Sequence, residues 1–356
     1  MTEAADVTLA LAEPAHDVLP VEETKPLSIS FTRSEEEYFR IWIVNLFLSV
    51  VTLGIYSAWA KVRNRQYLYR HTWLDGASFE YLADPRAILK GRILAVAVLG
   101  SIALAQKYSI ALYLIGIAVV LLATPWVVVK ALGFNARNSA WRNVRFSFHG
   151  TTGQAAFEYL KGLGFAVMTL GIGSSILQWR ITRFAVVNYA FGKLRFQFRT
   201  TGSEFFTAYF MAGAVGGLTM FLLGMIGFLA GGSDEGHRDV GVMLGVGAGY
   251  FVSFAFLKAR LANLVWGGID VGPHRLSAAL AFWQVLWIQA SNILGIVCTL
   301  GLAIPWAKVR YHRYLVSRLT LHASGPLIAE TTPSLDAGGA TGDALGDLGG
   351  FDLGFG

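Results

Sequence analysis

One stretch of this chain occurs more than once, and this repetition constrains the fold more than any other feature. Residues 52–63 read T-L-G-I-Y-S-A-W-A-K-V-R, and residues 299–310 read T-L-G-L-A-I-P-W-A-K-V-R. A weaker copy, T-L-G-I-G-S-S-I-L-Q-W-R, occupies residues 169–180. Self-similarity of this kind is the sequence signature of a fold assembled from related structural units. The sequence therefore predicts internal repeats.

The basic end of this motif recurs at residues 126–130 and 256–260. Together these copies define five basic stations, which are Arg63, Lys130, Arg180, Arg260 and Arg310. Long and short intervals alternate between the stations. We expect each long interval to hold a helical hairpin and each short interval to hold one apolar segment with a T-L-G motif.

The composition assigns the chain to the membrane. Of its 356 residues, 54% are hydrophobic and 15% are charged, and the mean hydropathy is +0.51. Soluble proteins contain about 25% charged residues. The net charge of +6 could suggest nucleic acid, but the basic residues lie beside long apolar runs, which is typical of the cytoplasmic face of a membrane protein. We predict an integral membrane protein whose partner is the lipid bilayer, and no nucleic acid.

Seven apolar segments are close to or above the length of about 20 residues that a helix needs to cross a bilayer. Two pairs of segments are joined by short polar tips, at residues 106–108 and 231–239, and each pair is typical of a helical hairpin. Each of the other three segments carries a T-L-G motif. The seven segments are residues 38–58, 88–105, 109–129, 157–178, 205–230, 240–257 and 280–305.

The three T-L-G segments leave two topologies open. If each segment crosses the membrane, the basic stations alternate between its faces. If each enters and leaves on the same face, every Lys and Arg except Lys107 and Arg238 shares one face. The positive-inside rule favours this second arrangement, with the basic collars in the cytoplasm. The alternative is a plain span with a tolerated glycine.

Glycine and proline give a local reason for a broken or re-entrant helix, because glycine tolerates unusual backbone angles and proline removes a backbone donor. Irregular backbone at membrane depth must be shielded by protein or line a cavity. The candidate break or hinge residues are Gly54, Gly171, Gly301 and Pro305.

Aromatic residues spaced two apart follow three of the stations. They are Phe79 and Tyr81, Phe146 and Phe148, and Phe196 and Phe198. Alternation with a period of two, next to Gly or Asp, predicts short β structure at the cytoplasmic surface, and a small sheet shared between units is possible. The fold class predicted is an all-α polytopic membrane protein with internal repeats, built from helical hairpins, broken or re-entrant T-L-G segments and small β-hairpin-like elements.

The two ends of the chain differ from its middle. Residues 1–27 are acidic and contain prolines, and residues 326–356 are rich in Gly and Asp without a basic residue. Such compositions bury too little apolar surface to offset the entropy of ordering. We predict disordered tails at 1–27 and 326–356, around a repeat-built membrane domain at 28–325.

Tryptophan and basic side chains alternate in the motif copies. On a helix, a tryptophan and the arginine four residues later share one face, so the indole can lie at headgroup level while the guanidinium reaches a phosphate. Basic residues at the surface also attract anionic lipid. An aromatic belt with positive-inside anchors is the simpler interpretation. The candidate headgroup- or anion-binding residues are Trp59, Lys61, Arg63, Arg180, Trp306, Lys308 and Arg310.

Catalytic and cofactor-binding patterns are absent from the sequence. The seven histidines lack metal-binding spacing, and no G-x-x-x-x-G-K-S/T loop occurs. Cys298, the single cysteine, is expected to be a small buried hydrophobe. Asn45 and Asn292 are expected to hydrogen-bond across helix interfaces, and Glu37 and Glu158 to pair with arginines of the motif copies. We predict no enzyme, no cofactor and no metal site.

The pattern E-Y-F-R-I-W-I-V-N-L-F-L-S-V-V-T-L-G-I-Y-S-A-W-A-K-V-R-N-R-Q-Y-L-Y at residues 37–69, with P-W-A-K-V-R-Y-H-R-Y at 305–314, resembles the YjgN-like family of bacterial inner-membrane proteins. The resemblance implies the inner membrane and adds no catalytic residue, because the family is one of unknown function. This chain departs from the family pattern at Ala58, where a proline is expected, and over most of residues 169–180.

Two functions fit these patterns. The first is transport or permeation of a small or anionic solute through a cavity shaped by the T-L-G elements. The second is a membrane-embedded lipid-binding or scaffold protein, whose basic aromatic collar binds anionic phospholipid headgroups or a partner. The sequence does not predict the oligomeric state.

Overall fold

The computed structural model describes residues 25–32 and 35–325, which form ten helices and eleven strands. Helices come in consecutive pairs, and short strands separate one pair from the next. The helices are α1 (Glu35–Val51), α2 (Ser57–Arg70), α3 (Pro85–Tyr108), α4 (Ile110–Asn138), α5 (Thr152–Met168), α6 (Ser174–Val187), α7 (Gly202–Ala230), α8 (Glu235–Trp266), α9 (Phe282–Cys298) and α10 (Ile304–Ser317). The strands are β1 (Lys25–Ser28), β2 (Ser30–Phe31), β3 (Thr72–Leu74), β4 (Ala77–Tyr81), β5 (Ser139–Trp141), β6 (Val144–Phe148), β7 (Tyr189–Phe191), β8 (Leu194–Phe198), β9 (Ile269–Val271), β10 (His274–Ala278) and β11 (Leu319–Ala323).

All eleven strands belong to one antiparallel sheet that nearly closes on itself. Its order is β1-β11-β10-β9-β8-β7-β6-β5-β4-β3-β2, and β1 and β2 are adjacent in the chain, with Ile29 between them. The first segment of the chain thus joins the two ends of the sheet. Each of the three predicted pairs of aromatic residues lies in one strand, in β4, β6 or β8. The all-α class is wrong, however, because strands from along the described chain pair into one sheet beside the helices.

Tight turns and a shared apolar interior hold this sheet together. The turn between β3 and β4 consists of Asp75 and Gly76, both with positive φ (47° and 73°), as two-residue hairpin loops require. Inside the sheet, Trp141, Phe191, Ile269 and other apolar side chains form one buried cluster. The burial of these side chains is the main force that keeps the short strands paired.

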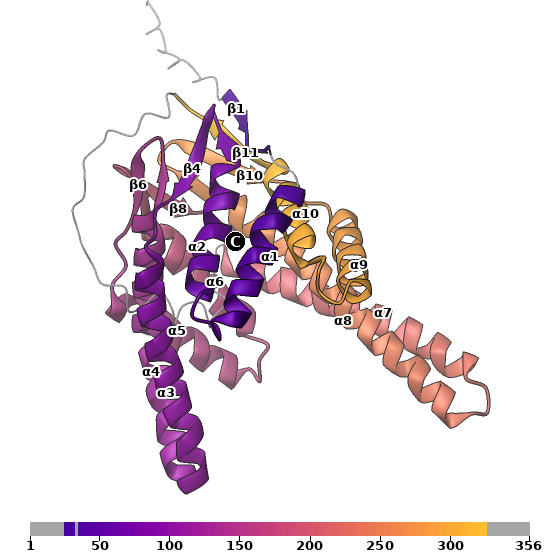
Figure 1. The fold of residues 1–356 in the computed structure, drawn as a ribbon. Helices are drawn as coiled ribbons and strands as arrows, with labels where there is room; N and C mark the ends of the chain where they lie inside the picture. The colour runs from indigo at the N-terminus through magenta and orange to yellow at the C-terminus, as the bar shows by residue number, and fades with distance from the viewer. Residues whose placement is uncertain (1–24, 33–34, 326–356) are drawn as a thin grey trace, which may run out of the picture.

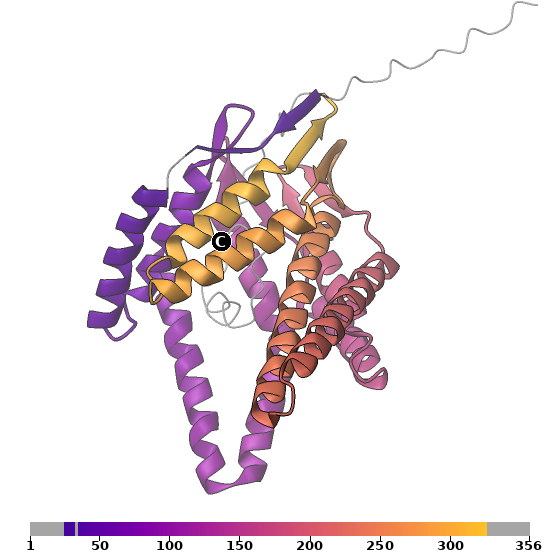
Figure 2. The same ribbon diagram turned by 90° about the vertical axis from the view of Figure 1, so that its right-hand side faces the viewer.

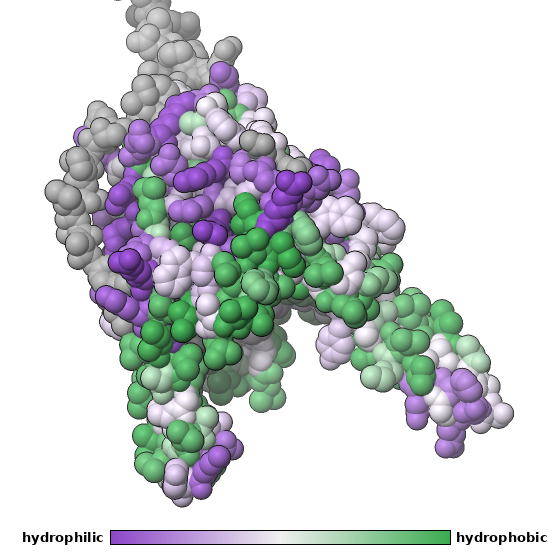
Figure 3. Space-filling model, viewed as in Figure 1, coloured by the Kyte–Doolittle hydropathy of each residue, from purple (hydrophilic) through white to green (hydrophobic). Residues whose placement is uncertain are grey.

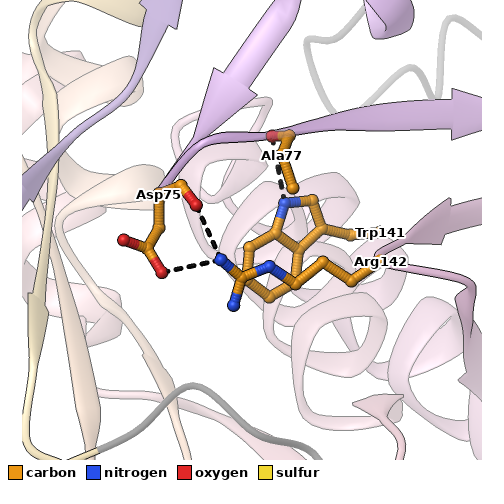
Figure 4. A network of polar contacts seen from close by, with 4 residues as sticks. All are labelled: Asp75, Ala77, Trp141 and Arg142. Atoms are coloured by element: carbon orange, nitrogen blue, oxygen red, sulfur yellow. Dashed lines mark hydrogen bonds and ion pairs between the residues drawn. The ribbon is translucent and has the colours of Figure 1, made fainter.

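Neighbouring hairpins are also linked through their turns (Figure 4). Arg142, in the turn between β5 and β6, donates to the Asp75 carbonyl at 2.6 Å and to its carboxylate at 2.8 Å. The same guanidinium lies 4.5 Å from the ring centre of Trp141, whose indole N–H donates to the Ala77 carbonyl at 3.3 Å. The ion pair is half exposed, so we expect it to add at most about 1 kcal/mol and mainly to align the two hairpins.

Each helix pair begins and ends at the sheet (Figures 1 and 2). Consecutive pairs touch one another, through α2–α3, α4–α5, α6–α7 and α8–α9, and α10 contacts α1. The helices therefore form a closed ring beneath the sheet. All five basic stations lie on the second helix of a pair, on the return to the sheet.

Two of the helix pairs are much longer than the other three. Helices α3, α4, α7 and α8 are long and apolar enough to cross a membrane, and both long pairs project beyond the rest of the molecule (Figure 1). Apolar residues cover their flanks, whereas hydrophilic residues cover the sheet end and the two tips (Figure 3). Helices α1, α5 and α9, which begin the short pairs, have 17 residues each.

The T-L-G segments are turns that reverse the chain. Leu53, Leu170 and Leu300 have φ of 50°, 51° and 51°, and the glycines that follow have φ of 90°, 92° and 95°. Each threonine hydroxyl donates to the carbonyl four residues earlier and accepts from the amide four residues later. None of the segments 38–58, 157–178 and 280–305 is therefore one continuous helix.

One boundary and one burial expectation change. Strand β1 begins at Lys25, inside the segment 1–27 assigned to a disordered tail, and residues 1–24 and 326–356 lie outside the described residues. Cys298, expected to be buried, is exposed at the end of α9, because this end of the helix faces outward beside the T-L-G turn.

The two helices of the α7–α8 pair touch backbone to backbone. Gly216 faces Gly249, and Gly224 and Gly227 face Gly245 and Gly241, respectively. Small residues allow membrane helices to approach this closely.

A candidate solute cavity beneath the sheet

A cavity of about 660 Å³ lies between α6, α8, α9 and α10. Its polar lining comes from each of the four helices and includes two lysines. The polar and aromatic side chains that line it are Gln178, Thr182, Lys258, Trp266, Gln289, Asn292, Lys308, Tyr311 and His312. Leu261, Val265, Ile293 and Ile296 contribute much of the remaining wall.

Helical geometry explains why Lys308 faces the cavity while its motif neighbours do not. Successive helical residues are rotated by about 100°, so Trp306 and Arg310 share one face and Lys308 lies on the opposite one. Trp306 is 59% exposed. Arg310 donates to the Ser291 hydroxyl at 2.8 Å and to the Asn292 side-chain oxygen at 3.3 Å, and so connects α10 to α9.

Lys258 and Gln178 occupy the same place in their own helices as Lys308. Each lies two residues before a basic station, Arg260 or Arg180, and each lines the cavity. The Lys258 ammonium lies 3.7 Å from the ring centre of Tyr311, a cation–π contact that holds it against α10. The sequence prediction missed Lys258, although its position two residues before Arg260, like that of Lys308 before Arg310, could have indicated it.

The other predicted residues are distributed around the ring. Arg180 forms an ion pair with Glu158 at 2.7 Å, which confirms the expected pairing of that glutamate. Arg63 is exposed, with its guanidinium 5.8 Å from the ring centre of Tyr56. Trp59 and Lys61 are half-buried on α2. Among the seven candidates, Lys308 is the one that lines the cavity.

The candidate break residues lie at two different places. Gly54, Gly171 and Gly301 are in the reversing turns, whereas Pro305 is in the first turn of α10, where a missing amide donor is tolerated. Asn45 donates to the Asn64 side-chain oxygen at 3.2 Å and Asn292 to the Ala307 carbonyl at 3.2 Å, so both amides bond across a helix pair as expected.

His312 lies where this cavity meets a second one. Its side chain is 5% exposed, its Nε2 lies 3.2 Å from the Thr72 hydroxyl, and its ring packs edge-on against Phe31. Burial, and then the charge of Lys308, lower the pKa of His312 to about 4. This histidine is therefore neutral near pH 7, and the positive charge of the cavity comes from the lysines.

The depressed pKa of His312 predicts acid sensitivity. The unfolded chain takes up a proton at this residue below about pH 6.5, whereas the folded protein resists it until about pH 4. The contribution of neutral His312 to the free energy of unfolding is therefore complete above pH 6.5. It falls by on the order of 3 kcal/mol as the pH drops from 6.5 to about 4. We expect His312→Gln to flatten the fall in melting temperature between pH 6.5 and 4. The same change at exposed His149 is the control, and an unaltered pH profile for His312→Gln would contradict the assignment.

The second cavity, of about 230 Å³, lies inside the sheet. Aromatic and aliphatic side chains dominate its wall. Val265, Trp266 and His312 line both cavities. Among the described residues, no group of three His, Cys, Asp or Glu side chains could hold a metal ion.

The fold defines a helical membrane protein with a sheet at one end and a cationic cavity between its helices. Over residues 26–348 the chain matches the family described as "Bacterial protein of unknown function (DUF898)", and it belongs to that family. It is similar to the "Inner membrane protein YjgN" of Salmonella typhimurium, with 22% identity over 349 residues, 83% of this chain and 88% of that protein. It is also 31% identical over 128 residues to the protein of that name from Escherichia coli O157:H7, covering 34% of this chain and 31% of that one.

No solved structure matches the chain. The resemblance to the YjgN-like family is confirmed, and the names of the relatives agree with an inner-membrane location.

Proposed function

We propose that this protein binds a small anionic solute in the cavity beneath the sheet and moves it across the inner membrane. The observation that carries the proposal is the presence of Lys258 and Lys308 on two different helices around one cavity. An ammonium group near apolar helices is strongly stabilised by an opposite charge, and intramembrane ionisable residues commonly mark solute pathways. Glutamine and asparagine side chains nearby can donate further hydrogen bonds to an anion.

The proposed topology has four spans and three re-entrant pairs related as repeated units. Helices α1, α5 and α9 are each about 26 Å long, shorter than the hydrocarbon core of about 30 Å. Because each pair returns to the sheet, every station lies on the sheet side, where the positive-inside rule puts the cytoplasm. The three turns would then lie among the acyl chains, and the cavity would face the cytoplasmic half of the membrane.

Flux measurements in proteoliposomes test this proposal. Inorganic phosphate and acetate serve as probes, with protein-free vesicles as the baseline. We expect Lys258→Gln and Lys308→Gln each to reduce flux at least tenfold, because a lost charge contact of about 1.4 kcal/mol or more has that effect. Arg260→Gln is the matched control, since Arg260 is exposed on the same helix as Lys258. Equal flux through wild type and both lysine variants would contradict the proposal.

A second function is lipid binding by the outer collar. Trp306 is 59% exposed and Arg63 is exposed, each on the return helix of a short pair, so both can meet lipid headgroups. In the same preparations, this alternative expects Arg63→Gln and Trp306→Ala to lower the anionic phospholipid that copurifies, while the lysine variants behave as wild type.

A further inference from the structure

The two cavities differ in chemistry and are neighbours. The cavity between the helices carries Lys258 and Lys308, whereas the cavity inside the sheet is lined mainly by apolar side chains such as Phe79, Trp141, Phe191, Phe196 and Leu276. Trp266, Val265 and His312 contribute to the walls of both. A charged region therefore adjoins an apolar one, with an indole at the boundary.

The apolar cavity is large for a protein interior. Interiors are packed as densely as organic crystals, and an engineered apolar cavity of about 150 Å³ already binds benzene. At about 230 Å³, the sheet interior leaves its wall residues without contacts that a ligand could supply. The volume suits one short hydrocarbon chain and excludes the paired chains of a phospholipid.

The polar residues at the base of the sheet interior do not form a second charge-binding site. The Arg65 guanidinium donates to the Asn135 side-chain oxygen at 2.6 Å and to the Tyr81 hydroxyl at 3.0 Å. Thr72 donates to the Leu68 carbonyl at 2.8 Å and contacts His312. Lys258 and Lys308, by contrast, line the neighbouring cavity.

We propose that the ligand is an amphipathic anion with a single acyl chain, whose charged group binds between Lys258 and Lys308 and whose chain passes Trp266 into the sheet interior. This inference rests on the proposed function and narrows its solute to that class. A medium-chain fatty acid and a lysophospholipid share this chemistry. Binding should then depend on chain length as well as on charge.

Equilibrium binding of radiolabelled decanoate tests the inference. The full chain is reconstituted in phosphatidylcholine nanodiscs, and binding to empty nanodiscs is subtracted. Unlabelled decanoate, hexanoate, acetate and decanol compete at known free concentrations. We expect affinity to rise about fourfold for each methylene that enters the apolar cavity, so decanoate should compete far more strongly than acetate. Lysophosphatidic acid, added in a separate arm, distinguishes a lysophospholipid from a free fatty acid by which of the two binds more tightly.

Two substitutions fill the sheet interior. Leu276→Trp on β10 and Val271→Phe on β9 both replace a side chain that lines the cavity with a larger one. Val271→Phe is the smaller change, and it serves as the test if Leu276→Trp does not fold. We expect each to weaken decanoate at least tenfold while leaving acetate unchanged. Arg275→Trp is the matched control, because Arg275 is exposed and its neighbour Leu276 points to the opposite face of the strand. Lys258→Gln should weaken decanoate and acetate alike.

The outcomes separate this inference from the function on which it rests. If acetate competes as well as decanoate and the filling substitutions have no effect, the sheet interior is not part of the site, although the anion site stands. If decanol competes as well as decanoate and Lys258→Gln has no effect, both the anion site and this inference fail. Absence of saturable decanoate binding would also overturn the inference.

Discussion

Replacing Gly245 with leucine is expected to destabilise the α7–α8 pair by more than about 3 kcal/mol, since overpacking against rigid neighbours has no route of relief. A Cβ atom at Gly245 would lie 2.2 Å from the Gly224 amide nitrogen and 2.8 Å from the Leu223 carbonyl carbon. Both neighbours are backbone atoms, so the helices themselves would have to separate. Thermal unfolding in detergent, followed by circular dichroism, measures the change.

Gly247 is the matched control for this experiment. It lies on the same helix, and a Cβ atom there would meet no atom within 4 Å. Leucine at this exposed position should be neutral or slightly stabilising, because leucine is the better helix former by up to about 1 kcal/mol. If Gly245→Leu and Gly247→Leu lower the melting temperature equally, the close packing of α7 on α8 is wrong.

This packing has a consequence for the cavity. Lys258 is carried by α8, and its place in the wall of the cavity that Lys308 also lines depends on how α8 packs against α7 and α9. Gly245→Leu should therefore impair anion flux as well as stability. Loss of stability without loss of flux in the folded fraction would mean that α7 does not position Lys258.

The local features of the fold could be predicted from the sequence because they are encoded locally. The T-L-G motif predicted a break, and its glycine indeed supplies the positive φ of a reversing turn. Phe146 and Phe148 predicted a strand through their spacing of two. The closure of the sheet could not be predicted, because the pairing of Leu27 with Leu321 joins strands from the beginning and the end of the described residues. Strands β9 and β10 were missed, since Ile269, Val271 and Leu276 lack the aromatic signal of the earlier pairs.

The site was predicted less well than the fold. The motif drew attention to Lys308 and Arg310 together, as one basic set. In the structure they face opposite ways, and Arg310 is bonded to Ser291 and Asn292. The rotation of about 100° per helical residue places them on opposite faces of α10. Which of these faces lines the cavity depends on how the helices pack around it, and that is a property of the tertiary structure. The equivalent position of Lys258, two residues before Arg260, relates it to Lys308 in the sequence, but only the packing of the helices shows that both line one cavity.

Aspartate in place of a turn leucine should reveal where the short pairs end. Leu53, Leu170 and Leu300 are 94%, 95% and 96% exposed, although each lies in the left-handed region that disfavours leucine. In water, aspartate would suit this backbone better and would do no harm. Within a bilayer, it should cost about 2.5 to 3.5 kcal/mol for each turn. We expect Leu53→Asp and Leu300→Asp to lower the amount of protein inserted in membranes, and the double variant to lower it further.

Leu82→Asp is the control for the turn variants. Leu82 follows β4 on the sheet side and is 45% exposed, so it is in water if the short pairs point into the membrane. In nanodiscs, the turn variants should melt at lower temperature than wild type, whereas Leu82→Asp should match it. If a turn variant equals Leu82→Asp in the amount of protein inserted and in melting temperature, that turn lies in water. The three short pairs would then lie outside the bilayer, and the cavity between α6, α8, α9 and α10 would open to solvent rather than to the membrane.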